Sequence, residues 1–80
     1  MIDDETLATL IRVRLPDARI SVRDLTGTRD HLDVTVRSQT FAGMPLLDRH
    51  RAVYAALREA LDDGRIHALQ LTTLAEEETP

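Results

Sequence analysis

The stretch Phe41-Ala-Gly-Met-Pro-Leu-Leu-Asp-Arg-His-Arg-Ala-Val-Tyr54, followed by Ile66-His-Ala-Leu69, decides the fold of this chain. Pro45 suits the first turn of a helix, and Gly64 stands where a helix commonly ends. An apolar stripe at helical spacing runs between them. Its members are Leu46, Leu47, His50, Val53, Tyr54, Leu57 and Leu61. The sequence therefore predicts a long amphipathic helix, followed by a strand from Ile66 to Leu74.

The preceding forty residues predict one helix and two strands. Asp3 or Asp4 suits a helix N-cap, and Pro16 ends the helix because the residue before proline resists the α conformation. The helix carries an apolar stripe of Leu7, Leu10, Ile11 and Leu15. Period-two alternation then marks two strands, with the apolar positions Ile20 and Val22 in the first and Leu32, Val34 and Val36 in the second.

The predicted order is helix, strand, strand, helix, strand. The turn at Thr26-Gly27-Thr28 is short and polar, so the first two strands should form an antiparallel hairpin. A strand–helix–strand crossover is right-handed and makes its strands parallel. We therefore expect an α+β domain in which both helices cover one face of a three-stranded mixed sheet.

Composition limits the protein class. A chain of 80 residues has room for one domain, so we expect a single domain over residues 1–80, with residues 75–80 as a frayed acidic tail. There is no cysteine, which fits a reducing compartment. No apolar run is long enough for a bilayer, and the acidic N-terminal residues do not resemble a signal peptide. These features predict a cytoplasmic protein without membrane contact.

The histidines are the candidate site residues. His31 opens the second strand and His67 the third, so a parallel pairing would place both at one end of the sheet, beside the hairpin turn. Such a pair can form a metal-binding edge. Strand parity argues against it, because His67 shares a face with Leu69 and Leu71 while His31 lies opposite Leu32. A locally hydrogen-bonded role for each histidine is the alternative.

His50 lies on the apolar stripe of the long helix. We expect it to be packed with its ring nitrogens hydrogen-bonded, a ligand role being the minority interpretation. Arg49 and Arg51 flank it, and we expect them on a solvated helix face because acidic residues share that side.

No motif for catalysis is present, since the chain lacks a P-loop, GxGxxG, HExxH and GxSxG. We therefore expect a protein that is not an enzyme. The helix and strand order resembles an RNA-binding KH domain, but the glycines are isolated, so the GxxG backbone clamp of that class is missing.

Taken together, the motifs resemble the BolA family. The resemblance rests on Phe41-x-Gly-x-x-Leu-x-x-Arg-His-Arg-x-Val-Tyr54, on Ile66-His-Ala-Leu69 with Thr72-Thr73, and on the Asp24-Leu-Thr-Gly27 turn with Asp30-His31. It covers nearly the whole chain and implies a KH-like, class II, αββαβ fold.

The resemblance also implies a role. BolA-like proteins pair with monothiol glutaredoxins and share a bridging 2Fe-2S cluster, for which the glutaredoxin and glutathione supply thiolates. A histidine of the Ile-His-Ala segment, here His67, is a ligand, and a His or Cys of the hairpin loop is the second. The Thr26–Arg29 turn has neither, and His31 is the nearest substitute. No cluster would be held by this chain alone.

Two alternatives remain. The family resemblance also implies DNA-binding transcriptional regulation, for which Arg49, Arg51, Arg58 and Arg65 are the motivation. A net charge of -4 limits such binding to a weak one, because affinity for DNA depends on neutralising phosphates. The other alternative is an interaction domain with structural histidines. For the isolated chain we expect a monomer.

Overall fold

The computed structural model describes residues 1–29 and 31–79. Its elements follow the predicted order, with a short 3-10 helix added between the second strand and the second long helix. They are α1 (Asp4–Arg14), β1 (Arg19–Asp24), β2 (His31–Arg37), η1 (Gln39–Phe41), α2 (Leu46–Asp62) and β3 (Ala68–Leu74).

Helix α1 begins and ends where local chemistry dictates. The Asp3 carboxylate caps it by accepting a hydrogen bond of 2.7 Å from the backbone N–H of Thr6, which satisfies one of the free donors at a helix start. The helix ends at Arg14, just before Leu15 and Pro16. Leu7 and Ile11 are fully buried, so the predicted N-cap and apolar stripe are confirmed.

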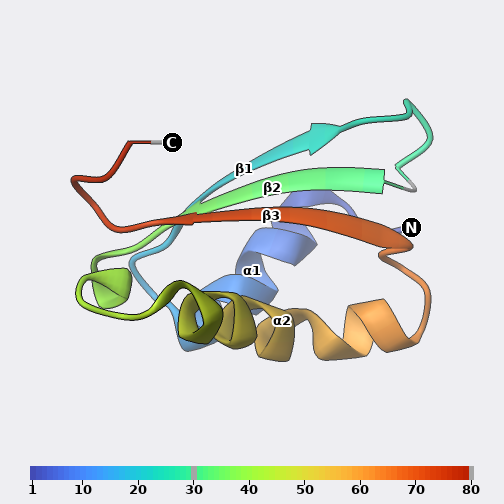
Figure 1. The fold of residues 1–80 in the computed structure, drawn as a ribbon. Coiled ribbons are helices and arrows are strands. Elements are labelled where there is room, and N and C mark those ends of the chain that lie inside the picture. Colours follow the sequence, from blue (N-terminus) through green and yellow to red (C-terminus); the bar gives the residue numbers. More distant parts are fainter. Residues whose placement is uncertain (30, 80) are drawn as a thin grey trace.

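The three strands form one mixed sheet in the order β1-β2-β3. β1 and β2 are antiparallel, with Val22 opposite Val34, and β2 and β3 are parallel, with Val34 opposite Leu71. Figure 1 shows both long helices on one side of this sheet. The predicted α+β fold, with a mixed sheet covered on one face, is therefore confirmed.

One hydrophobic core lies between the sheet and the helices. The central strand contributes Leu32, Val34 and Val36, all inaccessible to solvent. Phe41, on η1, is also fully buried, as expected for a side chain that fills the core from the connection. No helix of the described residues is both long enough and apolar enough to cross a membrane.

The buried face of α2 differs from the predicted stripe. The residues that it buries are Arg49, Val53, Leu57 and Ala60, whereas Leu46 and Leu47 are about 60% exposed and Tyr54 is exposed as well. Tyr54 follows Val53 by about 100° around the helix axis, which turns it away from the core. The predicted stripe is therefore wrong for Leu46, Leu47 and Tyr54. These side chains are apolar, but they are exposed and do not pack in the core with Val53 and Leu57.

The third strand is shorter at its beginning than predicted. It starts at Ala68 rather than at Ile66. Gly64, at a φ of 84°, ends the helical stretch in the left-handed conformation, and residues 65–67 form a bend. Ile66 is buried in this bend, and its N–H donates to the Ala60 carbonyl at 3.0 Å.

Candidate metal centre

His31 and His67 lie side by side at one end of the sheet. His31 is the first residue of β2, and its register partner on β3 is Ala68, the residue next to His67. The ring centroids are 5.9 Å apart and the ring planes are inclined by 17°, a stacked arrangement. Both side chains are exposed. The structure therefore brings together the two histidines that the sequence singled out.

The expected placement of the two histidines on opposite faces was wrong. A third strand that began at Ile66 would place His67 on the face of Leu69 and Leu71. In the structure, Leu69 and Leu71 do pack against the core, but the bend before β3 puts Ile66 inward instead, at 1% exposure. His67 then turns outward toward His31. Alternation holds only within a strand, and His67 lies one residue outside it.

The hairpin turn beside the pair is organised by Asp24. Its carboxylate accepts backbone hydrogen bonds from Thr26 at 3.2 Å, Gly27 at 3.0 Å and Arg29 at 2.9 Å. Partial burial acts to raise the pKa of Asp24, but these N–H donors outweigh it and lower the pKa below its usual value. The turn therefore has a defined shape.

A shallow hollow adjoins His31. Its volume is about 170 Å³, and it is lined by Leu25, His31, Leu32, Ala68, Leu69 and Gln70. Leu25 is 46% exposed and its N–H donates to the His31 carbonyl at 2.9 Å. An apolar side chain and an imidazole thus share one accessible edge of the sheet.

His50 lies outside this site. It is half-buried on α2, as the packing expectation requires, but no hydrogen bond of its ring is found among the described residues. Twelve residues separate it from the end of α2, or about 18 Å along the axis at 1.5 Å per residue. His50 is therefore not a neighbour of the pair.

Arg49 is the residue that the sequence prediction misplaced most. It was expected on a solvated face, yet it is only 9% exposed. Its guanidinium binds both oxygens of Glu78, at 2.5 and 3.1 Å, and Nε donates to the Met44 carbonyl at 2.9 Å. Arg49 precedes Val53 by four residues and Leu57 by eight. Its burial could have been predicted from this spacing, because residues at that spacing lie on one helix face.

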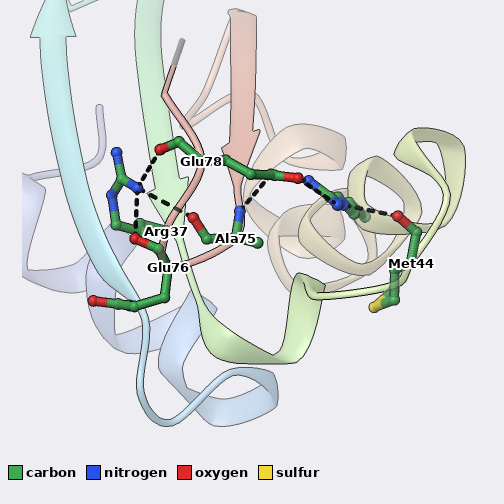
Figure 2. A network of polar contacts seen from close by, with 6 residues as sticks. Arg37, Met44, Ala75, Glu76 and Glu78 are labelled. Atoms are coloured by element: carbon green, nitrogen blue, oxygen red, sulfur yellow. Dashed lines mark hydrogen bonds and ion pairs between the residues drawn. The ribbon is translucent and has the colours of Figure 1, made fainter.

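The residues after β3 are held by Arg37 and Arg49. Figure 2 shows the contacts of Arg37 with Ala75, Glu76 and Glu78. Arg37 Nη1 donates to the carbonyls of Ala75, Glu76 and Glu78 at 3.1, 3.0 and 2.7 Å. Glu78 also accepts from the N–H of Ala75 at 2.7 Å. We call these contacts the tail network. The expected frayed tail is therefore wrong for residues 75–78, and residue 80 lies outside the described part.

The tail network fixes the charge of Glu78. The hydrogen bonds from Arg49, followed by the N–H of Ala75, lower the pKa of Glu78 from 4.5 to about 2. Reciprocally, the Glu78 carboxylate raises the pKa of Arg49. Arg49 is therefore engaged within the chain and is not a free surface cation.

Comparison with known proteins identifies the family. Residues 10–78 match the family described as BolA-like protein, and the chain belongs to the BolA family. It is 44% identical over 55 residues to Protein BOLA1, chloroplastic, of Arabidopsis thaliana, a match that covers 69% of this chain and 34% of that protein. The chain thus spans about a third of that relative's length.

Similar solved structures support the same family assignment. BolA1 from Arabidopsis thaliana superposes with a TM-score of 0.82 at 30% identity, covering 99% of this chain and 100% of that one. The XC975 protein gives a TM-score of 0.63 at 45% identity, covering 99% and 95% of the two chains. The predicted family resemblance is therefore confirmed.

Proposed function

We propose that this protein is a non-enzymatic cytoplasmic partner of a monothiol glutaredoxin and takes part in iron–sulfur cluster trafficking or in iron and redox regulation. In the complex, His67 and His31 would serve as ligands of a 2Fe-2S cluster that is shared with the glutaredoxin and glutathione. The observation that carries the proposal is the exposed pair of imidazoles, 5.9 Å apart, beside the hairpin turn.

The donor set fits a shared cluster. Imidazole can replace thiolate on one iron of a 2Fe-2S centre, while the other iron keeps sulfur ligands. This chain offers two neighbouring imidazoles and has no cysteine. Within residues 1–29 and 31–79, no group of three or more His, Asp or Glu side chains is placed to hold a metal ion. The remaining ligands would therefore come from the partner.

Each of the two histidines would have its own role in binding the cluster. His67 corresponds to the histidine of the family's Ile-His-Ala segment, and its ring would bind iron directly. His31 would take the place of the loop ligand, since the Thr26–Arg29 turn has neither His nor Cys. When bound, such a cluster would have a higher potential than one held by thiolates alone, because imidazole is a neutral ligand.

The decisive experiment is cluster transfer in solution. The protein is mixed with glutathione and a monothiol glutaredoxin loaded with cluster, and visible circular dichroism is recorded. We expect a changed spectrum with the wild-type protein, a loss of the change with His67→Ala, and a weaker change with His31→Ala.

His50→Ala is the matched control, because it also removes one imidazole but lies far from the pair. It should behave as the wild type. A spectrum that is unaltered on mixing, or the same for wild type and His67→Ala, would reject the proposal.

A further inference from the structure

We propose that Ile2 and Arg29 form a clasp that positions the two histidines, so that Arg29 is a positioning residue for the candidate metal centre. The role in ligation rests on the proposed function, whereas the positioning itself is a property of the free protein. The clasp consists of the backbone of Ile2, the side chain of Arg29 and the carbonyl of Arg65.

Ile2 connects the two segments that carry the histidines. Its backbone N–H donates to the Arg65 carbonyl at 3.2 Å, and its own carbonyl accepts from Arg29 Nε at 3.1 Å. Arg65 lies two residues before His67, and Arg29 lies two residues before His31. The Ile2 side chain is buried at 2% exposure, so this bridge is anchored in the core.

Arg29 is held on both its backbone and its side chain. Its backbone has a φ of 62°, and its N–H donates to Asp24 within the hairpin turn. Its Nη2 makes an ion pair of 2.6 Å with Asp4 at the start of α1. The turn is thereby tied to α1 as well as to the bend before β3.

The β-ladder alone does not provide this link. The register of β2 and β3 begins with His31 and Ala68, so the residues before that pair lie beyond the last strand pairing. The clasp supplies hydrogen bonds across this gap. A site whose donors are already placed has less conformational freedom to lose when a ligand binds, and groups behind the ligands commonly orient them.

The test compares two arginine variants of the full chain. Arg29→Ala removes the side-chain part of the clasp, and Arg19→Ala removes an exposed arginine that pairs with Glu76, at the opposite end of β1. Both variants lose one positive charge and one ion pair. Nuclear Overhauser contacts between the rings of His31 and His67 are measured in the free protein, with thermal unfolding as a check of folding.

We expect the ring-to-ring contacts to be lost in Arg29→Ala and retained in Arg19→Ala. Arg29→Lys, which keeps the charge but not the Nε donor, should retain part of their intensity and covers the case in which Arg29→Ala does not fold. Full retention of the contacts in both Arg29 variants would overturn the inference.

A second readout uses the cluster spectrum. Where the wild-type complex shows an altered visible circular dichroism, Arg29→Ala should reduce that alteration and Arg19→Ala should not. If the wild-type protein accepts no cluster, the proposed function fails while the ring-to-ring contacts still decide the clasp. The two failures are therefore distinguishable.

Discussion

At the scale of the residue, Glu78 illustrates how a local contact sets a charge. Its carboxylate accepts from Arg49 and from the N–H of Ala75, and both contacts favour the ionised form. Its pKa is about 2 in the folded protein, against an ordinary value of 4.5. The carboxylate of Glu78 is therefore protonated at a lower pH in the folded protein than in the unfolded chain.

This difference predicts an acid-dependent stability. A carboxyl group with a depressed pKa stabilises the fold above its unfolded pKa, and the contribution is lost as pH falls toward the folded value. We expect Glu78→Gln to be less stable than wild type at pH 7, and the gap to narrow between about pH 4.5 and pH 2. Urea unfolding at a series of pH values measures it.

Glu77→Gln is the control for that series, because Glu77 is an exposed neighbour that makes no contact in the tail network. A gap for Glu78→Gln that stays constant down to pH 2 would contradict the explanation.

The site residues themselves could be predicted only in part. His31 and His67 were identified from their places at the strand ends, and their common edge followed from parallel pairing. Their contact was not predictable, because it depends on a bend at residues 65–67 that places Ile66 in the core. Arg49 was missed for a related reason, since a charged residue was assumed to face solvent although its helical phase pointed inward.

At the scale of the element, Gly64 shows why α2 ends where it does. It follows the C-cap Asp63 and has a φ of 84°, a conformation that costs residues with a Cβ atom about 1–2 kcal/mol. A Cβ atom at this position would meet no neighbour within 4 Å. The requirement for glycine is therefore conformational and not steric.

We accordingly expect Gly64→Ala to lower the free energy of unfolding by about 1 kcal/mol. Gly64→Asn should cost less, because asparagine tolerates the left-handed region better than alanine. Chemical denaturation of the three proteins provides the comparison. Equal losses for the two variants would contradict a conformational origin.

The order of the elements and the sheet topology were predictable, whereas the face of α2 was not. Pro16, Gly64 and the alternation along β2 carry strong local signals that tertiary structure did not override. No such signal marks Leu46 and Leu47 as exposed. The sequence does not distinguish a packed apolar side chain at the start of a helix from an exposed one.

At the scale of the whole molecule, the arginines are mostly engaged within the chain. Ion pairs with carboxylates are formed by Arg19, Arg23, Arg29, Arg49 and Arg65. The arginines that motivated a DNA-binding role therefore include two, Arg49 and Arg65, whose charge is already paired. With a net charge of -4, the surface offers little compensation for phosphates.

We therefore expect no salt-dependent binding of duplex DNA at low ionic strength. Fluorescence anisotropy of a labelled duplex, titrated with protein at several salt concentrations, measures this. A steep decrease of affinity with salt that is relieved by Arg51→Ala or Arg58→Ala would instead favour the DNA-binding alternative.

The parallel pairing of β2 with β3 has a consequence for hydrogen exchange. β3 is an edge strand, and its chain connection to β2 is the long crossover through α2, whereas β1 and β2 form a local hairpin. Edge elements commonly open in partial fluctuations that leave the rest of a domain intact. Opening of β3 would separate His67 from His31 without unfolding the molecule. We therefore expect the lifetime of the histidine pair to follow local opening of β3, which amide exchange along β3 measures, more closely than global unfolding.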